Sequence, residues 1–409
     1  MWVRTQLKIG WSDLFATVSR SLLPLDQTHE KQRAETYFSN TRNTIACLSV
    51  RSGFDLLLQG LDLKPGDEVV FSALNVRAMV KVLNNLGLGA VPVDVDLATM
   101  QPRMDKLRQA ITPRSKVFVV AHLFGTRLDL SESFAFVKSK GLVTVEDCAQ
   151  AFNGRVYQGS SLADAVMYSF GPIKTATALG GALVIVRDHL LHQRMNEIQS
   201  RYPVQSSSQH RKRAIKFITL KAATAPLVLG FIYRYYRMRG MSYEDGLADK
   251  VRDVAPLKTM DKMRLQPSAL MLWLMNRRIY SFDMAPLQER AAKGRILSAL
   301  IAKSVHLPGQ ASKHHDFWVF PMLVKQPKEM IANLRAAGFD AADLPRSQHI
   351  AAPTDRPQLE PEAAAKLMRD IVIVPCYADM PDAEIRRLAE VVQKATTENP
   401  DAVRALAAE

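Results

Sequence analysis

The sequence predicts an α/β protein in which a mostly parallel central sheet is sandwiched by helices and followed by a smaller α+β domain. Between about residues 45 and 188, short apolar segments alternate with helix-length segments, which is typical of parallel strands joined by helical crossovers. Beyond about residue 200 this alternation stops. The 409 residues provide enough chain for one large domain and one smaller domain.

We expect three regions. Residues 1–44 mix apolar and polar positions without alternation and are predicted to form an N-terminal arm. Residues 45–260 are predicted to form the large domain, with a basic and apolar insertion at about 200–243. A linking helix and the small C-terminal domain are predicted for residues 261–409.

Within these regions the elements follow from the apolar pattern. Buried strands are predicted at 67–71, 90–95, 116–121, 142–146 and 180–187. Helices are predicted between them at 54–61, 77–86 and 130–140. A long linking helix is predicted from 267 to about 301, with proline in its first turn. Residues 305–395 again mix strands and helices, as expected of a small α+β domain.

The composition is that of a globular protein, with 47% hydrophobic and 23% charged residues. The formal net charge is +14, and residues 199–243 hold nine basic residues and no acidic one. Such clustering indicates a local basic surface rather than a general affinity for anions. No nucleic-acid-binding module is recognisable, so we expect no nucleic acid partner.

Three widely separated cysteines, Cys47, Cys148 and Cys376, form no C-x-x-C pair. This pattern indicates neither a zinc site nor a disulfide framework, and we predict no metal ion. The N-terminus has no apolar core of a secretory signal, and no segment of about 18 uninterrupted apolar residues occurs. A cytoplasmic protein is expected.

Two segments carry residues suited to chemistry. In V-T-V-E-D-C-A-Q (143–150) an apolar strand ends at Asp147, where open α/β sheets place ligand sites, although a helix-capping aspartate fits the pattern as well. In S-F-G-P-I-K-T (169–175) Lys174 lies among small and apolar residues. Loss of hydration would lower its pKa and make the neutral amine available, although a surface loop lysine is the alternative.

Together the two residues suit pyridoxal phosphate. That cofactor needs an amine to bond its aldehyde carbon and a carboxylate to keep its ring nitrogen protonated. It also needs a cradle for its phosphate. The run S-V-R-S-G (49–53) precedes a predicted helix, and the backbone N–H groups at a helix N-terminus can bind an anion.

The sequence resembles the DegT/DnrJ/EryC1/StrS family of sugar aminotransferases. The run S-V-R-S-G-F-D-L-L-L-Q-G-L-D-L-K-P-G-D-E-V-V (49–70) is similar to the family's S-G-[TR]-x-A-L…L-G-[IL]-x-P-G-D-E-V segment. V-P-V-D-V-D (91–96), H-L-F-G (122–125), V-E-D-C-A-Q-A-F (145–152) and S-F-G-P-I-K (169–174) follow in the family's order. The resemblance covers 45–188, fades in the basic stretch, and returns at 263–269 and 374–392.

The resemblance implies the PLP-dependent transferase fold of type I and a set of site residues. Lys174 matches the lysine that carries pyridoxal 5'-phosphate as an aldimine, and Asp147 matches the partner of the ring nitrogen. Further cofactor contacts are implied near the ring's phenolic oxygen and at the phosphate: Gln150, Ser169, Arg51 and Ser52. Family members are homodimers with shared active sites, and the segment that reaches the partner's phosphate corresponds here to Lys262 and Arg264.

Two departures from the family pattern stand out. The aromatic residue that stacks on the cofactor ring corresponds to the aliphatic Val76. The asparagine of the family's N-x-R segment is absent before Arg264. Arg346 and His349 lie where family members place substrate contacts, and surface residues are the alternative interpretation there.

The resemblance implies an aminotransferase that works through a pyridoxamine intermediate. An amino acid, typically glutamate, donates the amino group, and a keto sugar, nucleotide- or lipid-linked, accepts it. Lys174 would move the proton between substrate and cofactor. The family's dehydratases replace this lysine by histidine, so its presence favours transamination. A keto-sugar dehydratase and a non-catalytic regulatory or scaffold protein on the same fold are the alternatives.

Residues 211–240 combine cations and tyrosines with a short apolar centre broken by Pro226 and Gly230. One interpretation is a segment that lies on an anionic membrane surface, on the inner face of the membrane. The other is a buried helical pair or a dimer contact with a cationic rim.

Overall fold

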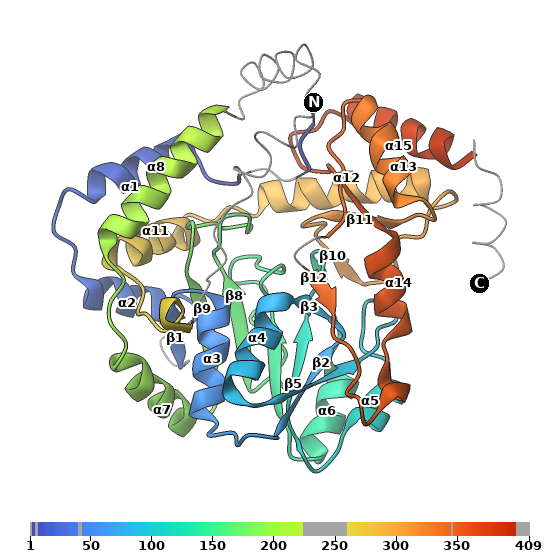
Figure 1. The fold of residues 1–409 in the computed structure, drawn as a ribbon. Helices are drawn as coiled ribbons and strands as arrows, with labels where there is room; N and C mark the ends of the chain where they lie inside the picture. Colours follow the sequence, from blue (N-terminus) through green and yellow to red (C-terminus); the bar gives the residue numbers. More distant parts are fainter. Residues whose placement is uncertain (1, 5–6, 40–42, 224–259, 345–346, 398–409) are drawn as a thin grey trace.

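A computed structural model describes residues 2–4, 7–39, 43–223, 260–344 and 347–397 of the chain (Figure 1). The large domain surrounds a seven-stranded sheet, and the smaller domain at the upper right of Figure 1 contains α12 to α15 with a two-stranded sheet. The predicted fold class is confirmed. The N-terminus reaches the small domain, where Trp2 bridges to Phe339.

The central sheet has the order β1-β9-β8-β7-β5-β2-β4, and only β9 runs against the other strands. Its strands are short and almost wholly buried: β1 (Thr44–Cys47), β2 (Glu68–Ser72), β4 (Gly89–Val93), β5 (Ser115–Ala121), β7 (Val143–Asp147), β8 (Ala165–Ser169) and β9 (Ala182–Val186). The predicted strands at 67–71, 90–95, 116–121, 142–146 and 180–187 are all present. The parallel strands end at one edge of the sheet, as a ligand site in this fold class requires.

Helices cover both faces of the sheet because successive strand residues point to opposite sides. Val69 and Phe71 face one core, which is covered by α3 (Val50–Gly60), α4 (Arg77–Leu86) and α7 (His189–Ser200). Val70 faces the other core, which is covered by α5 (Met104–Ala110), α6 (Ser131–Ser139) and α11 (Ala269–Tyr280). The helices predicted at 54–61, 77–86 and 130–140 correspond to α3, α4 and α6.

Residues 1–44 contain two helices, α1 (Trp11–Arg20) and α2 (Gln27–Glu35). Helix α2 packs on α11, and α1 packs on α8 (Ser207–Ala223). Leu14 of α1 and Ala34 of α2 are fully buried. The predicted arm therefore has helical structure of its own and contributes to the core of the large domain.

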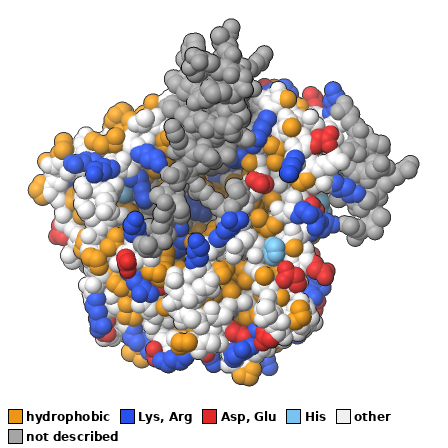
Figure 2. Space-filling view, viewed as in Figure 1, with side chains coloured by type: hydrophobic (Ala, Val, Ile, Leu, Met, Phe, Trp, Pro, Cys, Tyr) orange, Lys and Arg blue, Asp and Glu red, His pale blue; other side chains and the backbone are white. Residues whose placement is uncertain are grey.

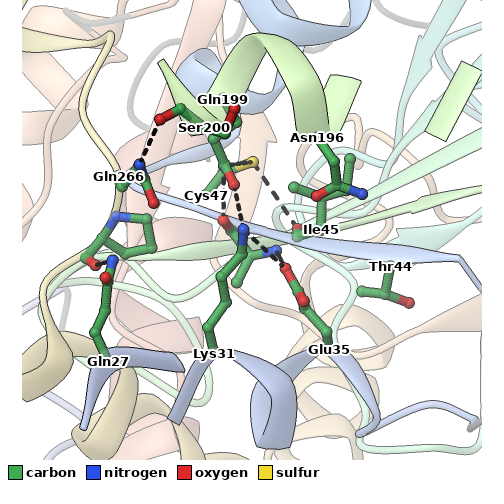
Figure 3. A network of polar contacts seen from close by, with 12 residues as sticks. Gln27, Lys31, Glu35, Thr44, Ile45, Cys47, Asn196, Gln199, Ser200 and Gln266 are labelled. Carbon is green, nitrogen blue, oxygen red and sulfur yellow. Dashed lines mark hydrogen bonds and ion pairs between the residues drawn. The ribbon is translucent and has the colours of Figure 1, made fainter. Parts of the chain in front are cut away.

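Helix α2 also protects the free edge of the sheet (Figure 3). Ala46 in the edge strand β1 donates its N–H to Glu35 Oε1 at 2.9 Å and accepts at its carbonyl from Gln199 Nε2 at 2.9 Å. Lys31 joins these two side chains, since its Nζ lies 2.7 Å from Gln199 Oε1 and 3.7 Å from Glu35 Oε1. Unpaired edge groups invite pairing with other chains, and here side chains satisfy them.

We predict that Glu35→Leu lowers the free energy of unfolding by about 1–3 kcal/mol, because the N–H of Ala46 loses its acceptor inside the protein. Glu35→Gln is the matched control, since its amide oxygen can still accept that hydrogen bond. Urea denaturation measures both variants. A leucine variant as stable as the glutamine variant would contradict this role of Glu35.

The predicted helix over 267–301 is wrong, because two helices occupy the segment. Helix α11 begins after Ser268, whose Oγ accepts from the N–H of Met271 at 3.4 Å, and it ends at Tyr280. Helix α12 (Ala285–Ile301) starts anew with proline in its first turn. Pro286 has no N–H to donate to a preceding helical turn, and the Asp283 carboxylate accepts from the N–H of Ala285 at 2.9 Å. A new helix therefore begins at this point.

The small domain confirms the α+β prediction. Its strands β11 (Phe320–Leu323) and β13 (Ile371–Val374) pair antiparallel, and its helices are α12, α13 (Pro327–Ala336), α14 (Glu362–Asp370) and α15 (Asp382–Thr397). Short ladders join it to the large domain: β6 (Thr126–Arg127) pairs with β10 (His314–His315), and β3 (Leu74–Val76) pairs with β12 (Ser347–His349). The described residues also contain 3-10 turns at Met260–Lys262 and Pro357–Leu359.

Helix α8 contains the first part of the predicted basic insertion, and residues 224–259 lie outside the described part of the chain. The membrane-surface interpretation of 211–240 therefore stays a prediction. Among the described residues, every helix is too short or too polar to cross a membrane. Lys and Arg side chains gather near the middle of the face shown in Figure 2.

Candidate active site

Asp147 and Lys174 come together at the edge of the sheet where the parallel strands end. Asp147 is the last residue of β7, and Ser169 is the last residue of the neighbouring strand β8. After β8 the chain turns, with the N–H of Lys174 donating to the carbonyl of Gly171 at 3.0 Å. The Asp147 carboxyl and the Lys174 amine lie close enough for each to shift the other's pKa.

Burial dominates the electrostatics of this pair. Burial raises the pKa of the Asp147 carboxyl. Two neighbours oppose that rise: the N–H of Ala149, which donates to Asp147 Oδ1 at 2.9 Å, and the nearby amine of Lys174. Burial also lowers the pKa of the Lys174 amine to about 8, against the attraction of Asp147. About half of the amine is therefore neutral at pH 8, and the neutral amine is the nucleophilic form.

We predict that, in cofactor-free protein, Lys174 reacts with an amine-directed reagent with a midpoint near pH 8. Below that pH the amine is protonated and unreactive, and above it the reactive neutral form dominates. Quantitative mass spectrometry of the Lys174 peptide across pH measures the midpoint, with the exposed Lys81 as reference in the same digest. Reactivity that still rises steeply above pH 10 would contradict the predicted midpoint.

The N-terminus of α3 lies beside the same turn. Cys47 pairs with Ala182, the N–H of Gly181 donates to the carbonyl of Leu48 at 3.0 Å, and the N–H of Phe170 donates to Gly181. A Cβ on Gly53 would lie 2.5 Å from Val184 Cγ2, so glycine lets α3 approach the sheet this closely. The helix start is thereby held against the segment that carries Lys174.

Small hydroxyl groups surround this helix start. Ser49 caps α3 by accepting from the N–H of Ser52 at 3.2 Å, and the two hydroxyl oxygens lie 3.0 Å apart. Ser169 Oγ accepts from the N–H of Gly171 at 3.4 Å. Arg51 in the first turn of α3 is partly exposed. Amide donors at a helix N-terminus together with serine hydroxyls form an arrangement suited to a phosphate.

Gln150 follows Asp147 in the loop after β7. Its Oε1 accepts from the N–H of Phe124, in the H-L-F-G segment, at 2.7 Å. With its oxygen engaged, the side-chain NH₂ group of Gln150 is the end that can donate to a bound molecule.

A buried network around Glu146 supports Asp147 and was not predicted from the sequence. His122 Nε2 lies 2.6 Å from Glu146 Oε1, and the N–H of Ser160 donates to Glu146 Oε2 at 2.7 Å. The hydroxyl of Tyr157 also donates to Glu146 Oε1. Burial by itself would raise the pKa of Glu146, and these hydrogen bonds bring that pKa below its usual value. The fixed carboxylate anchors the end of β7 next to Asp147.

Both residues at the centre of this network lie in motifs identified from the sequence: His122 is the first residue of H-L-F-G, and Glu146 directly precedes Asp147. From the sequence, those motifs pointed only to the family resemblance. His122 Nδ1 accepts from the N–H of Leu128 at 3.0 Å, so Nε2 is the nitrogen that donates to Glu146. The backbone N–H of His122 also donates to the carbonyl of Asp147 at 3.0 Å.

An aromatic residue from the small domain covers the lysine. The ring of Trp318 lies 4.4 Å from Lys174 Nζ, and its indole N–H donates to the carbonyl of Ile173 at 3.1 Å. Val76, which occupies the family's stacking position, is partly exposed at the end of β3. No local pattern pointed to Trp318, because it lies far from Lys174 in the sequence.

Of the two predicted substrate residues, the structure describes His349. His349 belongs to β12, which pairs with β3, so that His349 lies opposite Leu74 and Ser347 opposite Val76. His349 Nε2 lies 3.4 Å from Glu360 Oε1. Arg346 lies outside the described residues. The structure therefore brings His349 to the strand that carries Val76.

Arg264 is held within its own chain. Its Nε and Nη2 donate to the two carboxylate oxygens of Asp55, each at 3.0 Å, and Asp55 is fully buried in α3. This bidentate pair is among the stronger hydrogen-bonding arrangements. Lys262 is exposed nearby at the end of a 3-10 turn. The homodimer with contacts from Lys262 and Arg264 to the partner's site stays a prediction.

The arrangement is suited to a flat, anionic molecule that has a carbonyl group, a ring nitrogen and a phosphate. An amine with a lowered pKa can attack a carbonyl carbon, and a buried carboxylate nearby can hold a proton on a ring nitrogen. The start of α3 and the hydroxyls of Ser52 and Ser169 can hold a phosphate.

Comparison with known proteins agrees with this geometry. The model of the DegT/DnrJ/EryC1/StrS aminotransferase family matches residues 25–234, which is 210 of the 409 residues. GDP-perosamine synthase of Escherichia coli O157:H7 is 31% identical over 169 residues, 40% of this chain and 46% of that protein. A pleiotropic regulatory protein of Geobacillus stearothermophilus is 31% identical over 166 residues, 40% of this chain and 44% of that protein. The matching segment thus spans less than half of these relatives.

Solved structures match along nearly the whole chain. PseC of Helicobacter pylori, an aminotransferase involved in the biosynthesis of pseudoaminic acid, has a TM-score of 0.70 at 14% identity, covering 97% of this chain and 99% of that one. The PLP form of a putative sugar aminotransferase of Streptococcus pneumoniae has a TM-score of 0.64 at 17% identity, covering 97% and 99%. These likenesses show the fold, and the family match shows the membership: the chain belongs to the DegT/DnrJ/EryC1/StrS aminotransferase family.

Proposed function

We propose that this protein is a pyridoxal-phosphate-dependent aminotransferase that moves an amino group from an amino acid, glutamate first among the candidates, to a keto sugar that is nucleotide- or lipid-linked. One observation carries the proposal: the Lys174 amine, with a pKa of about 8, lies beside the buried Asp147 carboxyl at the strand ends. The family membership and a sugar-modifying relative support the choice of acceptor.

The residues present fit the cofactor. Lys174 offers a neutral amine at mildly alkaline pH, and Asp147 offers a carboxylate in a site that excludes most water. Ser52, Ser169 and the first turn of α3 offer donors for a phosphate, and the NH₂ group of Gln150 offers one for a ring oxygen. Val76 would offer the cofactor ring an aliphatic contact in place of an aromatic one, and Trp318 brings an aromatic side chain from the small domain to Lys174.

Bound at this site, pyridoxal phosphate would supply an electron sink for the transfer of an amino group. Lys174 would hold the cofactor through its amine and would accept and return a proton at Nζ. Asp147 keeps the ring nitrogen protonated through a charge-assisted hydrogen bond. The Glu146 network fixes the strand end that presents Asp147, and Trp318 shields Lys174 from water on the small-domain side.

The proposal is tested by incubating the holoenzyme with glutamate and a panel of keto-sugar nucleotides and lipid extracts. Mass spectrometry detects the amino sugar, and an enzymatic assay detects 2-oxoglutarate in equal amount. Glutamate alone should bleach the visible absorbance of the bound cofactor. A holoenzyme whose absorbance ignores every amino acid tested, and which aminates no acceptor, would rule the proposal out.

The two alternatives give different results in the same experiment. A keto-sugar dehydratase would form a deoxy sugar that contains no added nitrogen, and each 2-oxoglutarate formed from glutamate would be matched by free ammonia instead of amino sugar. A regulatory or scaffold protein would leave both the amino acid and the sugar unchanged. The presence of Lys174 together with the buried Asp147 favours the aminotransferase over both.

A further inference from the structure

A pocket on the small-domain side of the Lys174 turn has no role in the function derived so far. Three separate parts of the chain line it: the N-terminal segment, the Lys174 turn and the small domain with α12. Its lining residues are Arg4, Lys8, Ile173, Thr175, Arg290, Trp318, Cys376 and Tyr377. Three of these are cations, and none is an acid.

Arg290 is the residue that most needs explanation. Its side chain, on α12, is buried, with 6% of the residue exposed. Its Nε donates to the carbonyl of Asp316 at 2.7 Å. Within the described part of the chain, this is the hydrogen bond found for the Arg290 side chain, and no carboxylate oxygen lies within 4 Å of its nitrogens. A buried guanidinium is costly unless an anion and further hydrogen bonds compensate it.

The surrounding charges compensate Arg290 only in part. Burial lowers the pKa of Arg290 to about 10, and the nearby Asp316 opposes this shift. Asp316 is shared, since its carboxylate lies 3.7 Å from Arg127 as well. Lys8 faces the same pocket, and its pKa is lowered first by burial and then by repulsion from Arg290 and Lys221, against the attraction of Asp379. The pocket is therefore lined by two cationic side chains, Arg290 and Lys8, that are partly removed from bulk water.

The pocket also has a direct connection to the candidate site. Ile173 and Thr175 flank Lys174 in the chain, and Trp318 contacts both regions, with its ring 4.4 Å from Lys174 Nζ and its indole N–H on the carbonyl of Ile173. Thr175 adds a hydroxyl to the lining. An anion held by Arg290 and Lys8 would belong to a molecule whose other end can reach Lys174.

We propose that this pocket is a binding site for an oxyanion of a substrate, either a carboxylate of the amino donor or a phosphate of the acceptor. Arg290 is the principal ligand, because its planar fork of N–H donors matches both groups. Lys8 adds a second charge, and Arg4, paired with Asp340 at 3.3 Å, contributes to the positive field. This assignment of a subsite rests on the proposed aminotransferase function.

Isothermal titration calorimetry of the holoenzyme tests the pocket with two probes that cannot react. Glutarate presents the donor's carboxylates without an amino group, and inorganic pyrophosphate presents the acceptor's phosphates. We expect Arg290→Gln to weaken one of the two probes by about 10- to 100-fold, the loss of a charge-assisted hydrogen bond. Weaker glutarate binding assigns the pocket to the donor, and weaker pyrophosphate binding assigns it to the acceptor.

Two further variants keep the result interpretable. Lys8→Gln should weaken the same probe as Arg290→Gln, and it tests the pocket even if the buried Arg290→Gln variant fails to fold. Arg295→Gln, an exposed position on the same helix, is the matched control and should bind both probes as wild type does. The proposal is overturned if both pocket variants bind both probes with wild-type affinity, or if neither probe binds the wild-type holoenzyme.

The proposed function fails separately from this subsite. If glutamate does not bleach the wild-type cofactor absorbance, the aminotransferase proposal fails whatever the probes do. The subsite alone is rejected in a different case. There, the same glutamate concentration bleaches the cofactor absorbance of the wild type and of both pocket variants, and the variants bind both probes as the wild type does.

Discussion

Lys174→Ala is expected to remove covalent cofactor attachment and to lower kcat for amination by roughly 10²- to 10⁴-fold, the usual contribution of a positioned acid–base group. The side chain supplies both the bond to the cofactor and the proton carrier, and its pKa of about 8 suits both tasks near neutral pH. After borohydride treatment, the wild-type Lys174 peptide should carry the mass of the reduced cofactor. The variant should carry none.

Lys174→Arg separates chemistry from charge. A guanidinium keeps a cation over the ring of Trp318 but does not deprotonate in a protein, so it can neither attack a carbonyl nor shuttle a proton. We therefore expect the arginine variant to be as inactive as the alanine variant. The exposed Lys138→Ala serves as a control for the general loss of a lysine. Substantial amination by Lys174→Arg would show that position 174 acts through charge alone.

The large domain was largely predictable because its signals are local. Helix α4 was expected at 77–86, where it lies, and the strand ending at Asp147 was expected within one residue of its observed bounds. Strands buried on both faces must be continuous apolar runs, so β5 and β7 are visible in the sequence. The end of such a strand marks the ligand edge, which is why the sequence alone made Asp147 a candidate.

The missed elements depend on contacts between distant residues. Strand β8 has only a short apolar run, 165–168, and its pairing with β7 and β9 on either side establishes it as a strand. The interruption between α11 and α12 depends on Asp283 and Pro286. The prediction of a single helix used the apolar pattern and did not take these two residues into account. Periodicity reports burial, and it does not report where a helix restarts.

Half of the candidate site could be predicted, namely the half carried by strand ends and turns. Trp318 and Arg290 come to the Lys174 turn from more than a hundred residues away, through the packing of the small domain on the sheet. The residue pattern of one sequence cannot report such proximity. The absent aromatic at Val76 was noticed from the sequence, whereas the aromatic from the small domain required the structure.

Asp147→Asn is expected to lower kcat/KM for amination by roughly 10²- to 10³-fold. Losing one preorganised electrostatic group of an active site typically costs about 2.7–4 kcal/mol of transition-state stabilisation, and about 1.4 kcal/mol corresponds to a factor of ten in rate. Asparagine fills nearly the same space and can still accept from the N–H of Ala149, but it cannot hold a proton on a ring nitrogen by charge. Asp147→Glu keeps the carboxylate and should retain more activity than Asp147→Asn.

A second measurement on Asp147→Asn needs no turnover. The negative charge of Asp147 raises the pKa of Lys174, so its removal must lower that pKa further. In cofactor-free protein the midpoint of Lys174 labelling should therefore move below pH 8, and Asp147→Glu should keep it near the wild-type value. If the midpoint stays in place while activity falls, Asp147 acts on the cofactor but not on Lys174. If neither changes, the carboxylate has no part in the site, and the proposed chemistry loses its electron sink.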